Sequence, residues 1–413
     1  MTKHHEAYLY ASNDQVNHPA DHQGDMSADE RAHRALLNFI KDSDFTTANY
    51  FEACIHCGLC AEACHFYEVT GNPQYTPIWK LEPFKQAYRR EVSPLSTFYK
   101  LFNLKKKVTT EQLEEWQHLL YDSCTVCGRC SMICPMGIDI ASLILKARHA
   151  MYAAGLVPQD LWEASNRQET EGSPLGITPD KLRDTISSIE SEYGVEIPLD
   201  QPEADILLSA SSAELTKYPR TLADIAKILK HLGLSWSMRS DGYEASNYGM
   251  LAGNENGQRE MSLNLIDAAI ACKAKTVIIP ECGHAYSALR WEAARLYGKP
   301  LPFKVLHMSE FLADAIVEGR LKLNKTGKSV TFHDPCQVSR RGGAVDAPRI
   351  IMQELGVELH EMPVSGDLSW CCGGGGGVYT IERASNLRFK SYEVKMEQVN
   401  ESGADELYTS CSD

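Results

Sequence analysis

The chain has 413 residues, 43% of them hydrophobic and 23% charged, so it is long enough for two or three globular domains and is neither disordered nor fibrous. With 41 Lys and Arg against 55 Asp and Glu, its net charge is -14, which disfavours binding to nucleic acid. Cysteine is the unusual residue. The 14 cysteines are too many for a typical cytosolic enzyme and too few for a small disulfide-rich secreted protein.

The N-terminal segment is polar and lacks the apolar core of a signal peptide, so we expect a cytoplasmic protein. In that compartment disulfides are disfavoured, and clustered cysteines are more often metal ligands or redox-active groups. Residues 1–48 are predicted to form a polar arm and one helix, in which Ser27 and Glu30 can make a capping box. No stretch approaches the roughly 18 consecutive apolar residues of a membrane span, so any membrane role is expected to come through a partner.

Residues 49–151 contain two cysteine runs, CIHCGLCAEAC and CTVCGRCSMIC, separated by a helical linker. Two-residue gaps place three thiolates around one face of a cubane, and in two-cluster ferredoxins the fourth cysteine ligates the other cluster. We therefore predict a two-[4Fe-4S] ferredoxin-like domain that transfers electrons. The first cluster is assigned Cys54, Cys57, Cys60 and Cys134, and the second Cys124, Cys127, Cys130 and Cys64.

A pair of zinc knuckles is the alternative interpretation of these runs. Zinc sites usually pair two C-x-x-C hooks across a longer loop, and four cysteines in one short, duplicated run disfavour zinc. Gly58 and Gly128 follow the second cysteine of each run, where they let the backbone turn closely around sulfide. His65 stands where Pro135 stands in the second run, so the first run is slightly atypical.

Residues 152–203 contain several prolines and glycines and are predicted to be a linker with one helix near residues 180–193. Beyond it, short apolar runs alternate with amphipathic helical stretches, as is typical of α/β units with a parallel sheet. The predicted fold class is therefore α/β, or α+β overall. A helical two-cluster ferredoxin-like domain is followed by two repeated Rossmann-like units, at residues 204–300 and 301–413.

The last repeat carries a second group of cysteines. Cys336 ends the motif HDPC, a gap of 34 residues leads to Cys371 and Cys372 in WCCGG, and a gap of 38 leads to Cys411. Adjacent cysteines cannot easily serve one iron of an ordinary cubane, so the pair indicates an unusual site. This pattern resembles the cysteine-rich CCG-domain proteins that are fused to a two-[4Fe-4S] domain. The family includes the catalytic subunit of heterodisulfide reductase and the DsrK subunit of a sulfur-cycle membrane complex, and the resemblance covers residues of about 50 to 413.

The resemblance implies a noncubane-type [4Fe-4S] cluster at which substrate sulfur meets iron. Its matching ligands are Cys336, Cys371, Cys372 and Cys411. The family pattern ends in C-x-x-C, so we expect a further cysteine just beyond Asp413; the alternative is that the site has lost one ligand.

The first repeat departs further from the family pattern and keeps only Cys282, in the motif ECGHAY. Cys282 either contributes a ligand or a nearby thiol to the site of the second repeat, or is vestigial. His284 is a candidate proton donor, as is His333 with Asp334, and each could instead be structural. Cys272 is expected to be a buried core residue.

Two further features accompany this site. The glycines at 373–377 are expected to let the backbone approach the cluster closely, because no G-K-[ST] follows that would make them a phosphate loop. Arg340 and Arg341 either balance an anionic, thiolate-rich site or belong to a solvated face.

We therefore predict an oxidoreductase subunit that passes electrons through two cubanes to the noncubane-type cluster, for heterodisulfide-reductase-like disulfide or persulfide chemistry in sulfur metabolism. The alternative is an electron-transfer subunit of a flavoprotein dehydrogenase that oxidises glycolate, lactate or glycerol 3-phosphate and passes electrons to quinone. With no flavin or nicotinamide motif, the chain is expected to work in a complex. Its expected partners are a haem b membrane subunit or a sulfur-carrier protein, together with a thiol or disulfide substrate.

Overall fold

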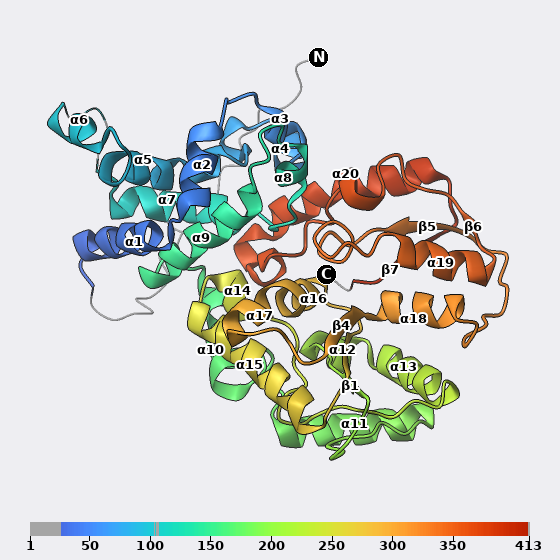
Figure 1. The fold of residues 1–413 in the computed structure, drawn as a ribbon. Helices are drawn as coiled ribbons and strands as arrows, with labels where there is room; N and C mark the ends of the chain where they lie inside the picture. Colours follow the sequence, from blue (N-terminus) through green and yellow to red (C-terminus); the bar gives the residue numbers. More distant parts are fainter. Residues whose placement is uncertain (1–25, 103, 105–106, 412–413) are drawn as a thin grey trace. The chain divides into compact units, whose positions relative to one another are not determined.

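The computed structural model describes residues 26–102, 104 and 107–411 (Figure 1). The polar arm expected at residues 1–25 lies outside the described residues. The chain divides into two compact units, each discontinuous in sequence. The first unit contains Met1–Glu163, Leu251–Asn254 and Trp370–Met396, and the second contains Ala164–Met250, Glu255–Ser369 and Glu397–Asp413.

The ferredoxin-like segment of the first unit is helical. Its helices are α1 (Ala28–Asp42), α2 (Phe45–Ala53), α3 (Leu59–Glu62), α4 (His65–Thr70), α5 (Glu82–Glu91), α6 (Ser96–Leu101), α7 (Thr110–Leu120), α8 (Arg129–Ile133) and α9 (Ile140–Ala153). Helix α1 begins as predicted, with Ser27 as N-cap and Glu30 closing the capping box. Helix α1 packs along α9 (Figure 1). The fully buried rings of Phe39 on α1 and Phe84 on α5 lie 4.8 Å apart.

Two small parallel sheets form the centre of the second unit. Their strands are β1 (Ile206–Leu208), β2 (Trp236–Ser237), β3 (Thr276–Ile279), β4 (Lys304–His307), β5 (Ser329–His333), β6 (Glu358–Leu359) and β7 (Glu406–Thr409). The first sheet has the order β2-β1-β3-β4 and the second β6-β5-β7. All pairings are parallel, so β2-β1-β3 repeats as β6-β5-β7, which confirms the predicted pair of α/β units.

Helices connect the strands of both repeats. The helices after α9 are α10 (Gln159–Glu171), α11 (Pro179–Tyr193), α12 (Ser212–Lys217), α13 (Pro219–His231), α14 (Tyr248–Ala252), α15 (Glu255–Ala271), α16 (Gly283–Ser287), α17 (Ala293–Tyr297), α18 (Met308–Val317), α19 (Asp346–Leu355) and α20 (Ser385–Ser402). Strand β4 and helix α18 lie between the two repeats in sequence. Cys272 is fully buried in the core around β3, which confirms its expected role.

The segment at residues 152–203 is more ordered than the predicted linker. The predicted helix is present as α11, whereas sequence reasoning missed α10 before it. On α11, the buried side chains of Leu182, Ile186 and Ile189 pack in the core that also contains β1. Much of this segment is therefore part of the second unit. In the described part of the chain, no helix is both long enough and apolar enough to span a bilayer.

Candidate functional site

The two cysteine runs have the same backbone. In each run the residue before the second cysteine, His56 or Val126, has a positive φ of 54° or 55°. The glycine after that cysteine, Gly58 or Gly128, has a φ of 84° or 76° and caps the short helix α3 or α8. A β-branched residue such as Val126 rarely adopts the left-handed conformation. Its recurrence at matching positions indicates that both loops are shaped for the same kind of ligand.

The eight cysteines of these runs gather into two groups of four. In each group, three cysteines come from one run and the fourth comes from the other run. One cavity is lined by Cys54, Cys57, Cys60 and Cys134, and a second by Cys64, Cys124, Cys127 and Cys130. These are the two ligand sets that the spacing predicts for crossed [4Fe-4S] clusters.

The chemistry of these thiols fits iron–sulfur clusters. All eight cysteines are free thiols. Burial raises the pKa of Cys130 well above its ordinary value, and the neighbouring thiols of Cys127 and Cys124 raise it further. Burial likewise raises the pKa of Cys60. Coordination to iron would stabilise the thiolates and remove the penalty of ionising several crowded, buried thiols.

Two buried lysines lie beside the cysteine groups, and sequence reasoning missed both. Lys80, only 1% exposed, lines the second cavity and donates a hydrogen bond to the Ser123 carbonyl. Lys85 is also buried, with its Nζ 3.4 Å from His56 Nε2. A thiolate-ligated cluster is anionic, so buried cations beside it offset its charge. Two lysines in the stretch WKLEPFK give little sequence signal, because lysines are usually exposed.

The Cys371-Cys372 pair belongs to the first unit and lies against the second cysteine run. The Thr125 hydroxyl oxygen lies 3.2 Å from Cys371 Sγ. Beside it, the Arg129 guanidinium stacks on Trp370, 3.6 Å from the ring centre. These contacts join the loop between Cys124 and Cys127, and the start of α8, to the CCG motif.

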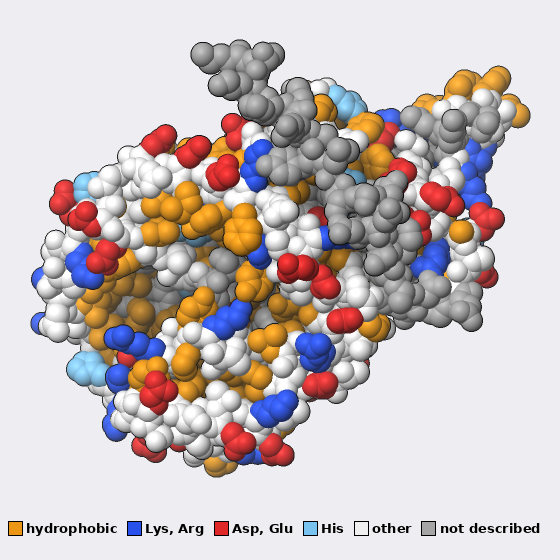
Figure 2. Space-filling model, turned by 180° about the vertical axis from the view of Figure 1, so that it is seen from behind, with side chains coloured by type: hydrophobic (Ala, Val, Ile, Leu, Met, Phe, Trp, Pro, Cys, Tyr) orange, Lys and Arg blue, Asp and Glu red, His pale blue; other side chains and the backbone are white. Residues whose placement is uncertain are grey.

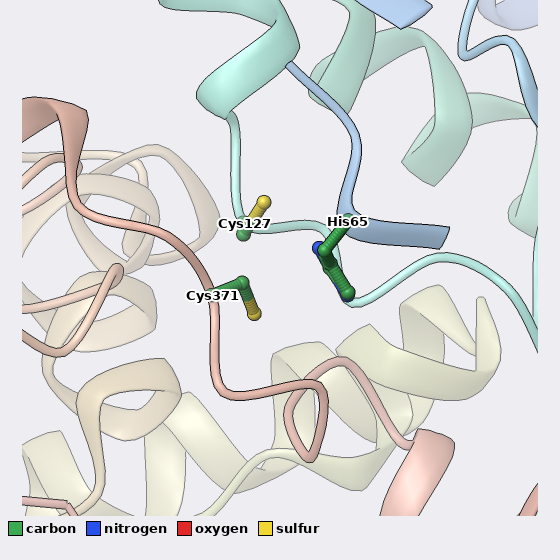
Figure 3. A group of neighbouring side chains, drawn as sticks. All are labelled: His65, Cys127 and Cys371. Carbon is green, nitrogen blue, oxygen red and sulfur yellow. The ribbon is translucent and has the colours of Figure 1, made fainter. Parts of the chain in front are cut away.

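Figure 3 shows His65, Cys127 and Cys371 lying together, although they come from three separate segments. A ring nitrogen of His65 and the sulfurs of Cys127 and Cys371 all lie within 4.8 Å of one another. Cys127 is predicted to ligate the second cubane and Cys371 the C-terminal cluster. The group is therefore better interpreted as a contact between two predicted ligand sets than as a third metal site.

The glycine loop lies close to the second cysteine run, where the Thr125 backbone is one of its partners. Its predicted approach to the C-terminal cluster stays a prediction. A Cβ on Gly376 would lie 2.5 Å from the Thr125 carbonyl carbon. A Cβ on Gly377 would lie 2.9 Å from the Leu161 side chain, and Gly377 has a φ of 85°. Side chains at these positions would push the loop away from the second cysteine run.

Arg148 on α9 ties the same segments together, and sequence reasoning missed it. Its side chain is fully buried and donates hydrogen bonds to the carbonyls of Leu120, Cys124, Leu251 and Gly376 at 2.7–3.0 Å. Burial lowers the pKa of Arg148, but a guanidinium stays protonated in proteins. One buried cation therefore connects the backbone of a predicted cluster ligand to that of the glycine loop.

Cys336 and Cys411 belong to the second unit. Cys336 follows β5 and Cys411 follows β7, which are neighbouring parallel strands. Because the carboxyl ends of parallel strands meet at one edge of a sheet, both cysteines follow the same edge, where α/β folds place their ligands.

Cys282 is the N-cap of α16 and follows β3 in the first repeat. A Cβ on the adjacent Gly283 would lie 2.9 Å from Gln337 Cβ. Ser287 Oγ lies 3.2 Å from Gln337 Oε1. The Cys282 loop and α16 therefore pack on the residues that directly follow Cys336.

The candidate proton donors His284 and His333 are both buried. Asp334 has a structural role. It forms a bidentate ion pair with Arg349, with Nη2 and Oδ2 2.8 Å apart, and accepts a hydrogen bond from the Gly366 N–H at 2.7 Å. Of the His333–Asp334 pair, only the histidine remains a candidate for proton transfer.

Arg340 also has a structural contact. Its guanidinium donates hydrogen bonds to the carbonyls of Asp367 and Ser369, in the segment that leads into Trp370. Arg340 therefore fixes the approach to the CCG motif through backbone carbonyls. The two roles predicted for Arg341 stay predictions.

Comparison with known families agrees with this arrangement. Residues 50–138 match the model of the 4Fe-4S dicluster domain, and residues 330–413 match that of the cysteine-rich domain named CCG. The chain therefore combines a domain that carries two [4Fe-4S] clusters with a CCG domain. No solved structure matches the chain.

Three relatives extend the similarity to most of the chain. An Hdr-like menaquinol oxidoreductase iron-sulfur subunit 2 of Archaeoglobus fulgidus is 25% identical, covering 94% of this chain and 79% of the relative. A subunit of the dihydromethanophenazine:CoB--CoM heterodisulfide reductase of Methanosarcina barkeri is 27% identical, covering 87% and 86%. An EtfAB:quinone oxidoreductase of Syntrophomonas wolfei is 26% identical, covering 92% of this chain and 55% of the relative. The chain is thus an iron–sulfur electron-transfer protein similar to subunits of heterodisulfide-reductase-like oxidoreductases.

Proposed function

We propose that the chain delivers electrons through its two cubanes to a noncubane-type cluster that reduces or forms a disulfide or persulfide bond in sulfur metabolism. The observation that carries this proposal is the contact of Cys371 with Thr125 and Cys127. A predicted ligand of the C-terminal cluster stands beside a predicted ligand of the second cubane. This closeness gives electrons a short route to the CCG motif.

The ligands proposed for the two cubanes rest on the two cysteine-lined cavities, and those proposed for the third cluster rest on the family pattern. The two cubanes take the cysteine groups that line the two cavities. The third cluster takes Cys336, Cys371, Cys372 and Cys411, all within the matched CCG domain. When bound, such a cluster supplies iron that can hold one sulfur of an opening disulfide.

The chain's own residues would supply protons and hold the site. Reduction of one disulfide consumes two electrons and two protons and releases two thiols. His284 and His333 are the proposed proton donors, because both are buried histidines next to predicted site cysteines. Thr125 would donate its hydroxyl hydrogen to the Cys371 sulfur, and the Gly373 N–H points at the same sulfur at 3.4 Å.

We propose that Cys282 acts beside Cys336, as a ligand or as a nearby thiol. The support is the packing of Gly283 on Gln337, which brings the only cysteine of the ECGHAY motif to the loop after HDPC. If Cys282 were vestigial, its replacement by serine would leave disulfide reduction unchanged.

The test is reduction of disulfides by the full chain under anaerobic conditions, with reduced viologen as electron donor. Coenzyme A disulfide and cystine serve as substrates, and released thiols are counted. We expect thiol release by the wild-type protein and loss of it in the C371S/C372S variant, with the cubane absorbance retained. The buried-core variant C272A is the matched control and should behave as the wild type.

The second candidate function is electron transfer to or from quinone, as in the rival dehydrogenase subunit. The names of two relatives, a menaquinol oxidoreductase subunit and an EtfAB:quinone oxidoreductase, favour it. In this case the same preparation would reduce a soluble menaquinone analogue and release no thiols from either disulfide. That pair of results would replace the disulfide proposal.

A further inference from the structure

The segment between α5 and α7 carries an apolar surface at its tip. No residue of α6 is buried. Leu95, Phe98, Leu101, Phe102 and Leu104, which we call the apolar tip, are each between 50% and 76% exposed. The rings of Phe98 and Phe102 lie 4.7 Å apart, and the other three apolar side chains lie within the same ten residues. A contiguous exposed patch of this kind marks an interaction site more often than scattered surface residues do.

The same segment is strongly basic in an acidic protein. Together with the end of α5, its described residues include the basic side chains of Arg89, Arg90, Lys100 and Lys107 against one acidic residue, whereas the whole chain has a net charge of -14. The acidic residue, Glu91, lies 3.3 Å from Arg90 and 2.7 Å from Lys100, so two cations already neutralise it. The positive excess is therefore concentrated beside the apolar tip.

The position of the tip within the first unit suits an external contact. Figure 1 shows α6 at the end of α5, away from the cluster-binding helices α3, α4 and α8. Figure 2 shows hydrophobic side chains gathered at this end, with Lys and Arg side chains beside them. The tip can therefore be covered without blocking the cysteine loops.

We infer that the apolar tip inserts into the surface of a membrane that contains anionic phospholipids. Large apolar side chains flanked by lysine and arginine are the composition of segments that lie in the lipid headgroup region. The basic side chains pair with anionic headgroups, and the apolar ones enter the acyl boundary. A neutral protein groove would satisfy the apolar residues but would leave the concentrated positive charge unexplained.

The inference changes the expectation that a membrane role comes only through a partner. The rest of the chain carries the acidic excess, so an anionic surface attracts the tip more than the remainder of the protein. This orientation places an electron-transfer protein at the membrane surface by its own residues. The inference does not depend on the proposed disulfide chemistry.

The test is co-sedimentation of the full cluster-loaded chain with vesicles of phosphatidylcholine alone or with 3:7 phosphatidylglycerol to phosphatidylcholine, about 30% anionic lipid. We expect at least tenfold tighter binding to the anionic vesicles, and strong weakening at high salt. The F98S/L101S variant should lose at least tenfold in affinity for the anionic vesicles. The K100E/K107E variant should lose the salt-sensitive part of binding.

A matched control distinguishes insertion of the apolar tip from nonspecific hydrophobic binding to vesicles. The V317S/F389S variant removes two other well-exposed apolar side chains and should bind as the wild type does. Visible absorbance of the clusters shows whether each variant is folded. Equal binding to both vesicle types, or unchanged binding of F98S/L101S, would overturn the inference. Binding of the tip to a membrane protein, without binding to protein-free vesicles, would also overturn the inference.

Discussion

Thr125 Oγ1 lies 3.2 Å from Cys371 Sγ, so the loop of the second cubane and the Cys-Cys motif share a hydrogen bond across 246 positions of sequence. A sulfur that ligates iron is an acceptor, and the hydroxyl is then the donor. Hydrogen bonds to ligand sulfur stabilise the reduced, more negative form of a cluster. The contact therefore both positions Cys371 and tunes the cluster proposed there.

Replacing Thr125 by valine should lower the midpoint potential of the C-terminal cluster and leave the cubane potentials nearly unchanged. A hydrogen bond worth about 1 kcal/mol corresponds to roughly 40 mV for one electron. An EPR-monitored redox titration measures both. The T125S variant keeps the hydroxyl and should keep the wild-type potential. Equal potentials in T125V and wild type would show that the hydroxyl does not act on the cluster.

Replacing Arg148 by methionine should destabilise the protein by about 3–5 kcal/mol, because several buried carbonyls lose a charged donor. The R148K variant keeps the positive charge but loses the planar guanidinium with its several N–H donors. Its stability should therefore lie between those of R148M and the wild type. Thermal unfolding followed by circular dichroism and by cluster absorbance measures the loss. The matched control is R220M, which alters a largely exposed arginine on α13 and should change little. A wild-type melting temperature in R148M would contradict the assigned role.

The crossing of cubane ligands can be tested by combining substitutions. If Cys64 and Cys127 ligate the same cluster, C64S/C127S loses one cubane, whereas C64S/C57S loses both. The expected iron loss is about four atoms in the first variant and about eight in the second. Iron analysis with Mössbauer spectroscopy measures these losses. The reverse order of losses would mean that each run holds its own cluster.

Burial lowers the pKa of His307 to about 4, against about 6.5 in an unfolded chain. Between these values the unfolded chain binds a proton that the folded protein does not, so stability falls as the pH drops from 6.5 toward 4. Above pH 6.5 both states leave His307 neutral, and this histidine does not affect the free energy of unfolding. At pH 5 its preference for the unfolded chain lowers the free energy of unfolding by about 2 kcal/mol.

The H307N variant removes this titration, and asparagine can still cap α18. Urea unfolding at pH 7 and pH 5 should therefore show a smaller stability difference for H307N than for the wild type. The control is H360N, which alters a partly exposed histidine in the second repeat. If the free energy of unfolding depends on pH identically in H307N and the wild type, His307 does not cause the acid sensitivity.

Features with a local pattern could be predicted from the sequence. The cysteine runs, the capping box at Ser27 and the alternation of strands with helices each depend on residues that are close in the chain. The repeat predicted two similar α/β units, and their sheets share the order β2-β1-β3 and β6-β5-β7. Helix α10 was missed because its sequence is polar and is flanked by proline and glycine.

The residues that connect the sites could not be predicted in this way. Thr125 meets Cys371, and Arg148 meets Gly376, only because distant segments fold together. From the sequence alone, Lys80 and Arg148 are expected to be exposed, since charged side chains are rarely buried. Both side chains can be buried because backbone carbonyls accept their hydrogen bonds. Lys80 also lines the cavity that contains the second group of cysteines. The local sequence pattern does not predict which distant carbonyls will accept these hydrogen bonds.

The most direct test of the central claim is EPR of the anaerobically oxidised full chain, with and without an added thiol such as coenzyme A. Oxidised cubanes of this kind are EPR-silent, so a signal from the oxidised protein must come from another cluster. We predict a paramagnetic signal that appears only with thiol and is absent from the C371S/C372S variant. If the oxidised wild-type protein gives no thiol-dependent signal, and only the cubane signals appear on reduction, the result would contradict substrate chemistry at the CCG motif and leave the chain as an electron relay.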